Sequence, residues 1–335
     1  MQYTKLGKSG VTVSKVCLGT MHFGGPTSEE EAFKIMDRAL EMGINFFDTA
    51  NVYGGAGGRG KSEEIIGKWF QSRSGSRDQV VLATKVYNPM VEGDVPNEDR
   101  GISAYKTRKH VNDSLRRLQT DRIDLYQVHH YDRHVTPEEF WGTFERLIND
   151  GKVLYMGSSN YPGWGLAKFQ MHALQRGSLG FVSEQTMYSL LCRAPELEVL
   201  PAAEHYGIGV IPYMPLAGGL LTGKKVSVAG SRTASVENEY GIYLGDTNAQ
   251  LTAFSNLCRE LGETETVVAI AWTLAQPAIA SPIVGARTVE HLDGLDRAAE
   301  LKLDAATLAK LDEIFDINKG RPLRTGKPAP EAYAW

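Results

Sequence analysis

Short apolar runs alternate with stretches of helical periodicity along nearly the whole chain, and this alternation limits the possible folds more than any other feature. We expect eight strands, at about residues 16–19, 44–48, 80–85, 123–129, 153–157, 180–185, 208–212 and 280–284. Each of the seven intervals between them can hold a helix, and further helices are expected near 288–300 and 305–316. Repeated strand–helix units are typical of a parallel sheet with helices packed on it.

Local signals mark the ends of several of these helices. Ser28 and Glu31 have the spacing of a capping box, and Gly43 follows where that helix is expected to end. Thr136 and Pro137 mark another helix start, because proline is favoured at the first helical position.

Eight strand–helix units favour an α/β fold of the (β/α)8 or TIM-barrel type, as a single domain over residues 1–335. A doubly wound sheet is the alternative on pattern alone. Against it, no expected strand is followed by the spaced glycines of a dinucleotide-binding turn. Residues 3–6 and 11–13 flank a short turn and predict an N-terminal hairpin that closes the barrel floor.

Four segments fit no regular element. Residues 54–60, 88–101 and 224–249 are glycine-rich or polar and are expected to form large loops on the substrate side. The C-terminal tail at 328–335 carries two aromatic residues that could cover a bound substrate; a frayed terminus is the alternative.

Composition excludes several classes of protein. The net charge of −4, with both signs interspersed, argues against a nucleic-acid polymer as partner. No apolar run is long enough to cross a bilayer, and the first residues lack a signal peptide's apolar core, so we expect a cytoplasmic protein. Cys17, Cys192 and Cys258 are too scattered for a zinc site or a disulfide framework, and no metal is expected. The oligomeric state is left open.

Ionisable side chains stand at the ends of successive expected strands. Asp48 ends the run at 44–48, Tyr53 follows in a glycine-rich loop, and Lys85 and His129 end the next two runs. The carboxyl ends of all strands of a parallel barrel lie on one face, where active sites are found. We therefore expect these four side chains to share one site.

Side chains along a strand alternate between its two faces. The pattern therefore predicts Ile44, Phe46 and Asp48 on one face of the second strand. It likewise predicts Gln127 and His129 on one face of the fourth.

The chain resembles the aldo-keto reductase superfamily. The motifs that carry the resemblance are Asp48-Thr49-Ala50 followed by Tyr53-Gly54, then Thr84-Lys85, then Asp124-Leu125-Tyr126 followed by His129, with further matches at 157–160, 184–185, 215–224 and 282–287. They stand in register from about residue 15 to about residue 295. The resemblance implies a barrel enzyme that reduces small-molecule carbonyl compounds.

The resemblance implies one catalytic role for each of the four clustered side chains. Tyr53 would donate the proton, and the Lys85 ammonium would lower the pKa of that phenol from about 10. Asp48 would supply the counter-charge that a buried lysine needs. His129 would donate a hydrogen bond to the substrate oxygen. His130 is adjacent, and a shift of one residue in the alignment would exchange the two histidines.

NADPH/NADP⁺ is the cofactor that the resemblance implies. Ser159, Asn160 and Gln185 would bind the nicotinamide carboxamide, Tyr213 would stack under the ring, and Arg287 would bind a 2′-phosphate. The loop at 216–223 would surround the pyrophosphate. The full implied set is Gly19, Thr20, Met21, Asp48, Ser159, Asn160, Gln185, Tyr213, Pro215, Leu216, Gly218, Gly219, Lys224, Gly285, Arg287 and His291. His291, Gly294 and Leu295 depart from the family pattern, which leaves the adenine contacts open.

A narrower resemblance points to an actinobacterial branch that includes dTDP-4-keto-6-deoxyhexose 2,3-reductases. It is carried by the loop at 54–60, the segment at 127–132 and the tail at 328–335. Two other functions stay open at this point. One is an NADPH-binding regulatory subunit with low turnover, and the other is a Schiff-base aldolase that uses Lys85 as nucleophile.

Overall fold

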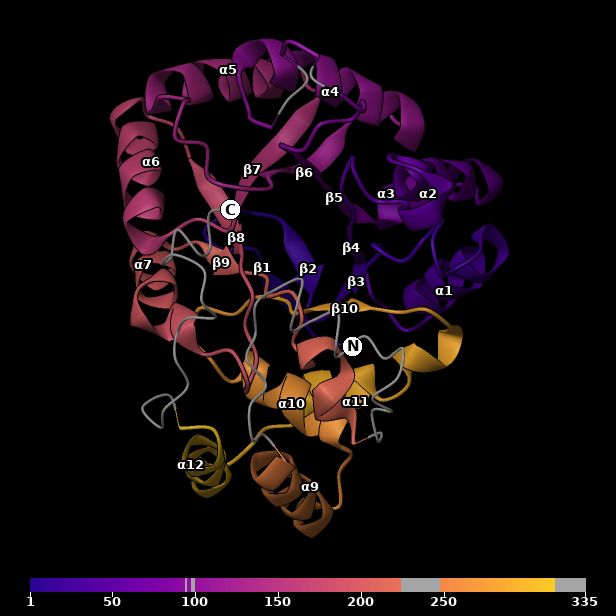
Figure 1. Ribbon diagram of the computed structural model, residues 1–335, viewed down its shortest axis with the longest axis vertical. Helices are drawn as coiled ribbons and strands as arrows, with labels where there is room; N and C mark the ends of the chain where they lie inside the picture. Colours follow the sequence, from indigo (N-terminus) through magenta and orange to yellow (C-terminus); the bar gives the residue numbers. More distant parts are fainter. Residues whose placement is uncertain (94, 98–99, 224–247, 317–335) are drawn as a thin grey trace.

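Eight parallel strands form one sheet in the order β10-β3-β4-β5-β6-β7-β8-β9, surrounded by helices (Figure 1). The computed structural model describes residues 1–93, 95–97, 100–223 and 248–316. Its strands are β3 (Cys17–Gly19), β4 (Phe46–Asp48), β5 (Val81–Val86), β6 (Ile123–Val128), β7 (Val153–Ser159), β8 (Phe181–Gln185), β9 (Gly209–Val210) and β10 (Ile283–Gly285). Lys224, most of the loop at 224–249 and the tail at 328–335 lie outside the described residues.

Helices fill the intervals between the strands, as the sequence pattern predicts. The α-helices are α1 (Glu29–Glu41), α2 (Lys61–Ser72), α3 (Ser76–Gln79), α4 (Ala104–Leu118), α5 (Pro137–Asn149), α6 (Gly163–Gln175), α7 (Val199–Tyr206), α9 (Asn248–Leu261), α10 (Glu265–Leu274), α11 (Leu295–Glu300) and α12 (Ala305–Ile314). Short 3₁₀ helices are η1 (Gly55–Gly57), η2 (Ala194–Leu197), η3 (Ala217–Thr222) and η4 (Val289–Leu292). Within the described ranges no helix has the length and apolar character needed to cross a membrane.

Backbone hydrogen bonds between the two edge regions close the sheet into a barrel. The Val210 amide donates to the Ala278 carbonyl over 2.8 Å, and the Ala280 amide donates back to the Val210 carbonyl over 2.8 Å. The Ile283 amide, at the start of β10, donates to the Pro212 carbonyl over 2.8 Å. The prediction of a (β/α)8 barrel is confirmed, and the doubly wound alternative is wrong because an open sheet would leave these edges unpaired.

The barrel has an inner and an outer core, and the N-terminal hairpin belongs to the inner one. Strands β1 (Tyr3–Lys5) and β2 (Thr12–Ser14) pair antiparallel. Leu6 and Val13 are fully buried in a cluster with Phe46 and other inward side chains of the strands. The hairpin therefore closes the floor of the barrel, as predicted, and keeps water away from its interior.

The second expected strand begins later than the sequence suggests. The Ile44 amide donates to the Ala39 carbonyl over 2.8 Å, so Ile44 still belongs to the turn that ends α1. Its side chain packs in the outer core, whereas Phe46 lies in the inner one. The prediction that Ile44 shares a face with Phe46 and Asp48 was wrong for this reason.

Both predicted helix starts are present, one of them with different partners. The Thr136 hydroxyl accepts from the Glu139 amide ahead of α5. The Ser28 hydroxyl accepts from the Glu31 amide over 3.2 Å, but the Glu31 carboxylate accepts from the Val289 amide over 3.2 Å, so the capping box is only half formed. Glu31 instead joins α1 to η4 across the molecule.

A buried carboxylate ties β5 to two helices beside the catalytic face. Glu63 on α2 is fully buried. It accepts from the Thr84 hydroxyl of β5 over 2.6 Å and from the Arg117 guanidinium of α4 over 2.7 Å. Thr84 directly precedes Lys85, so this contact fixes the strand end from which Lys85 extends.

We expect Arg117→Ala to lower the free energy of unfolding by about 3–5 kcal/mol, because it leaves the buried Glu63 carboxylate without its counter-charge. Arg116→Ala is the matched control. Arg116 is the preceding residue, its side chain is 76% exposed, and its ion pair with Asp113 should contribute about 1 kcal/mol or less. Urea denaturation of both variants measures the free energy of unfolding. Equal decreases in the two variants would show that the buried Arg117–Glu63 pair stabilises the fold no more than the exposed pair does.

Candidate functional site

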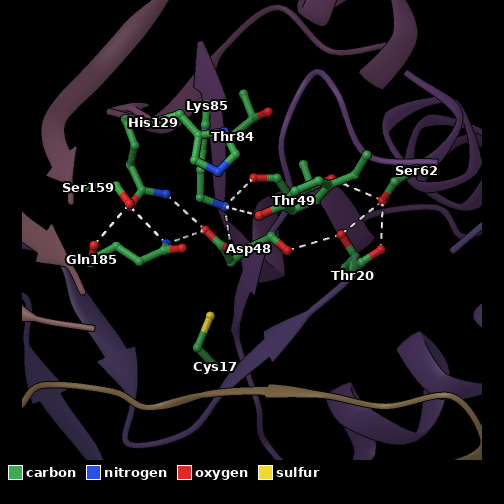
Figure 2. A network of polar contacts seen from close by, with 12 residues as sticks. Cys17, Thr20, Asp48, Thr49, Ser62, Thr84, Lys85, His129, Ser159 and Gln185 are labelled. Atoms are coloured by element: carbon green, nitrogen blue, oxygen red, sulfur yellow. Dashed lines mark hydrogen bonds and ion pairs between the residues drawn. The ribbon is translucent and has the colours of Figure 1, made fainter. Parts of the chain in front are cut away.

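A buried ion pair between β4 and β5 forms the centre of the site at the carboxyl ends of the strands (Figure 2). The Lys85 ammonium, fully buried, donates to Asp48 Oδ1 over 2.6 Å, to the Thr49 carbonyl over 2.8 Å and to the Tyr53 hydroxyl over 3.3 Å. Burial alone would lower the pKa of Lys85, but the Asp48 carboxylate, the Tyr53 hydroxyl and the hydrogen bonds to both raise it above 10.5. Lys85 is therefore a charged ammonium at neutral pH.

The pKa of Tyr53 departs from the sequence-based prediction. Burial raises the pKa of Tyr53 above 10, and the nearby Asp48 carboxylate acts in the same direction, so the opposing effect of Lys85 is outweighed. The prediction of a lowered pKa was wrong, because it counted the ammonium and neglected burial and the carboxylate. Tyr53 is thus a neutral phenol at physiological pH, with its proton in place.

His129 lies beside Tyr53, with ring centroids 5.8 Å apart. Burial, together with the nearby Lys85 ammonium and His130, lowers the pKa of His129 well below 6.5, so the imidazole is neutral. Its Nδ1 atom is buried and has no hydrogen-bond partner among the described residues. Because an unpaired buried N–H is rarer than an unpaired acceptor, we assign the ring proton to Nε2.

His130 stacks on the far side of His129, with ring centroids 5.1 Å apart. Its ring contacts that of Tyr87, whereas the ring of Tyr53 contacts that of His129. Burial, with Arg100 as a smaller contribution, lowers the pKa of His130 to about 4. This arrangement supports His129 over His130 as the histidine of the site.

A cluster of three hydroxyl groups fixes the backbone around Asp48 and was not foreseen from the sequence (Figure 2). Ser62, at the start of α2, lies 3.0 Å from the hydroxyls of both Thr20 and Thr49 and donates to the Thr20 carbonyl. The Thr20 hydroxyl donates to the Asp48 carbonyl over 3.0 Å. Thr49 is also the residue whose carbonyl binds Lys85. In the sequence, the only sign of this cluster is that Ser62 follows the glycine-rich loop closely. A serine near such a loop does not by itself predict these hydrogen bonds.

The residues predicted to bind the nicotinamide carboxamide are brought together at the ends of β7 and β8. Asn160 donates to Ser159 Oγ over 3.1 Å and to the His129 carbonyl over 3.0 Å, and it accepts from the Tyr213 hydroxyl over 2.9 Å. Ser159 Oγ donates to the Gln185 carbonyl. These contacts place Tyr213 and Asn160 next to His129.

Gln185 is oriented differently from its predicted role. Its side-chain amide donates to Asp48 Oδ2 over 3.0 Å and to Gln127 Oε1 over 3.1 Å. Its contribution to carboxamide binding stays a prediction.

The loop after β9 has an unusual backbone conformation. Ala217, Gly218 and Gly219 have φ values of 48°, 68° and 105°. The amides of Ala217 and Gly219 donate to the Met214 and Leu216 carbonyls, each over 2.9 Å, so these two N–H groups are used within the loop. A Cβ built at Gly219 would meet nothing within 4 Å, so the space beside the loop is open. Binding of a dinucleotide pyrophosphate at this loop stays a prediction.

The remaining predicted cofactor residues lie around β3 and β10. Gly19 and Gly285 are paired neighbours on these strands, and Met21 is 37% exposed. Arg287 is exposed, and within the described part of the chain no hydrogen bond or ion pair involves its guanidinium. His291 Nδ1 is bonded to the Thr288 hydroxyl and amide at the start of η4. A role for His291 toward the adenine stays a prediction.

Glu184 is the outward neighbour of Gln185 on β8, and it supports the turn that carries Asn160. Its Oε1 accepts from the Tyr161 amide over 3.1 Å, while Oε2 is buried without a partner among the described residues. Burial raises the pKa of Glu184 to about 8, although hydrogen bonds from Ser158 and from the backbone of Tyr161 and Asn160 oppose this. Glu184 is therefore mostly protonated at neutral pH.

A comparison with known proteins identifies the family. The model described as Aldo/keto reductase family matches residues 15–316. The chain belongs to the aldo/keto reductase family. It is therefore an NAD(P)-dependent oxidoreductase. Among the described residues, no group of three His, Cys, Asp or Glu side chains is placed to hold a metal ion.

Three similar proteins carry oxidoreductase names. A Bacillus subtilis (strain 168) protein described as uncharacterized oxidoreductase YrpG is 51% identical over 337 aligned positions, which cover 100% of both chains. Norsolorinic acid reductase B of Dothistroma septosporum is 32% identical over 96% of this chain and 83% of that protein. Aryl-alcohol dehydrogenase (NADP⁺) of Phanerodontia chrysosporium is 32% identical over 95% of this chain and 89% of that protein.

The raised pKa of Glu184 predicts a pH-dependent contribution to stability. Between pH 4.5, its ordinary pKa, and about 8, the folded state keeps a proton that the unfolded state releases, so stability falls as pH rises. The loss is roughly 1.4 kcal/mol per pH unit, on the order of 5 kcal/mol in total.

We expect Glu184→Gln, which keeps an oxygen acceptor for Tyr161, to remove this loss. Urea denaturation at pH 5 and pH 8 measures the free energy of unfolding of both proteins. The free energy of unfolding of the variant, relative to that of the unchanged protein, should be higher at pH 8 than at pH 5. A stability difference that is the same at both pH values would contradict the prediction.

Proposed function

We propose that this protein is an NADPH-dependent reductase that converts an aldehyde or ketone to the alcohol. The observation that carries the proposal is a pair of hydrogen-bond donors beside the buried Lys85–Asp48 pair. Within the described part of the chain, neither the Tyr53 hydroxyl proton nor the His129 Nε2–H has an acceptor. A carbonyl oxygen is an acceptor that both groups could bind at once.

The states of these groups suit protonation of a developing alkoxide. Tyr53 holds its proton at neutral pH, and the Lys85 ammonium at 3.3 Å stabilises the phenolate that forms when the proton leaves. Neutral His129 orients the oxygen without competing as an acid. Asp48 keeps Lys85 charged throughout.

NADPH, when bound, supplies the hydride. In this proposal Asn160 and Ser159 bind the carboxamide, Tyr213 contacts the ring, the η3 loop lies along the phosphates and Arg287 binds a 2′-phosphate. The aryl-alcohol dehydrogenase relative, whose name specifies NADP⁺, supports this cofactor.

The two other candidate functions have weaker support. A Schiff-base lysine needs a lowered pKa, but that of Lys85 is raised, so its amine is protonated and a poor nucleophile. A regulatory subunit with low turnover needs no proton donor, whereas Tyr53, Lys85, Asp48 and His129 are all assembled here.

The substrate is best sought among two classes. An aromatic aldehyde is the first, because Tyr53, His129, His130 and Tyr87 form a continuous series of ring contacts and one relative is named for aryl alcohols. A nucleotide-linked keto-deoxysugar is the second, on the narrower resemblance of the sequence. The rate of NADPH oxidation with each class of substrate, followed by the absorbance of the reduced nicotinamide, ranks the two.

We expect Tyr53→Phe to reduce the rate of carbonyl reduction by roughly 10²–10⁴, the usual contribution of a positioned general acid. NADPH should still quench the protein's fluorescence, since the cofactor contacts are unchanged. Tyr126→Phe is the matched control, because its hydroxyl is buried on β6 without a partner among the described residues. Near-normal turnover of Tyr53→Phe would remove Tyr53 from the mechanism.

Arg287→Ala should weaken NADPH binding by roughly ten- to a hundredfold and leave NADH binding almost unchanged. The reason is that Arg287 is exposed beyond β10 and its guanidinium is available for the 2′-phosphate that only NADPH carries. Fluorescence titration with both cofactors measures the effect. Equal losses would show that Arg287 does not distinguish the phosphate.

A further inference from the structure

We propose that Gln127 is a positioning residue of this site, which holds the Asp48 carboxylate in the orientation that keeps Lys85 directed at Tyr53. The inference rests on the proposed function, because its readout is carbonyl reduction. Gln127 acts through Asp48, because its amide bonds to that carboxylate whereas the Tyr53 hydroxyl is bonded to the Lys85 ammonium.

The two oxygens of Asp48 have separate sets of donors. Oδ1 accepts from the Lys85 ammonium over 2.6 Å. Oδ2 accepts from Gln127 Nε2 over 2.8 Å and from Gln185 Nε2 over 3.0 Å. Asp48 is 3% exposed and Gln127 is fully buried, so water does not replace these donors. A hydrogen bond to a charged acceptor is about twice as strong as one between neutral groups.

The orientation of the Gln127 amide follows from its partners. A carboxylate only accepts hydrogen bonds, so the NH₂ group must face Asp48. The Gln127 carbonyl oxygen in turn accepts from Gln185 Nε2 over 3.1 Å. The opposite rotamer would place two oxygens against each other and two NH₂ groups together. The two glutamines therefore form a fixed pair that spans from β6 to β8.

Gly157 on β7 leaves the space that this pair occupies. Gly157 pairs with Gln127 on one side and Ser183 on the other. A Cβ at Gly157 would lie 2.4 Å from Ser183 Oγ and 3.0 Å from Gln127 Cγ, both too close. A larger residue on β7 would thus displace Gln127, and the glycine allows the amides of β6 and β8 to meet across the barrel.

The consequence for catalysis is indirect. Without Gln127, Asp48 Oδ2 would keep only Gln185, and the carboxylate could rotate away from Lys85. The ammonium would then be held less firmly at 3.3 Å from the Tyr53 hydroxyl. We therefore expect loss of the Gln127 amide to lower the rate of the proton-transfer step and to leave the affinity for the cofactor unchanged.

The first test is Gln127→Met, which keeps the side-chain length and removes the amide. We expect kcat to fall by at least about tenfold, the lower value for a hydrogen bond to a charged group, with the Kd of NADPH changed by less than about twofold. Gln170→Met is the matched control. Gln170 is also fully buried and bonds through its amide to the Leu179 carbonyl and the Phe181 amide, away from the site. It should lose stability and keep kcat.

The second test is Gln127→Glu, which has the same shape and so tests the chemistry if the methionine variant does not fold. In this variant the introduced carboxyl group and Asp48 lie at hydrogen-bond distance and share one proton. Because two neighbouring negative charges repel, the pKa for the loss of that proton is raised. While protonated, the introduced carboxyl group donates to Asp48 Oδ2 as the amide does. Once ionised, it repels Asp48. Activity of Gln127→Glu should therefore fall as pH rises, with a single-proton dependence.

The groups around Asp48 make this readout clear. The titratable side chains facing it are Lys85 from β5, Tyr53 from the loop after β4, His129 after β6 and Cys17 from β3. The pKa values of Lys85, Tyr53 and Cys17 are raised above 10.5, 10 and 9, and that of His129 is lowered well below 6.5. None of them titrates between pH 6.5 and 9. Glu184, with a pKa of about 8, faces outward on β8 and is present in both proteins, so the kcat profile of Gln127→Glu is compared with that of the unchanged protein.

The outcomes separate the two proposals. A tenfold loss in Gln127→Met with an unaffected Gln170→Met, or a kcat of Gln127→Glu that falls with pH more steeply than that of the unchanged protein, supports the positioning role. Rates within twofold of the unchanged protein for both Gln127 variants at every pH overturn it and leave the proposed function standing. If the unchanged protein reduces no carbonyl compound with NADPH, the proposed function falls and this inference falls with it.

Discussion

The buried ion pair between Asp48 and Lys85 is the constraint on which the rest of the site depends. Removing both charges from water costs several kcal/mol per ion unless the geometry is good and the remaining hydrogen-bonding groups are satisfied. Here the Lys85 ammonium has three acceptors and the Asp48 carboxylate has three donors. The pair is stable only because four neighbouring groups, drawn from β6, β8 and the loop after β4, converge on it.

Those groups can converge only in a closed barrel. Asp48, Lys85, Gln127 and Gln185 extend from four different strands into one interior. The hydrogen bonds of Val210 on β9 with Ala278 and Ala280, and of Ile283 on β10 with Pro212, complete the wall around them. The hairpin beneath, with Leu6 in the inner core, keeps water from entering at the floor. Fold and chemistry are thus linked through burial. Water that entered the barrel would weaken the ion pair with Asp48, which keeps Lys85 charged.

The sequence predicted what depends on local periodicity and left out what depends on contacts across the barrel. Their positions at the ends of expected strands placed Asp48 and Lys85 on the catalytic face, and the helix signals at Thr136 were sufficient for α5. The direction of the Tyr53 pKa shift was missed, because burial of that phenol is a property of the assembled site. Glu31 was expected to cap its own helix, but it bonds to Val289, 258 residues away. No local pattern contains a partner at that distance.

Adjacent residues of β8 face opposite sides of the barrel wall and meet different surroundings. Gln185 faces inward and donates to Asp48 Oδ2, while Asp48 Oδ1 accepts from the Lys85 ammonium. Glu184 faces outward, where its donors are neutral and one oxygen has no partner among the described residues, so burial raises its pKa to about 8. The Lys85 ammonium lies 2.6 Å from Asp48, which is why Asp48 can serve as its counter-charge, whereas Glu184 supports the turn beside the site.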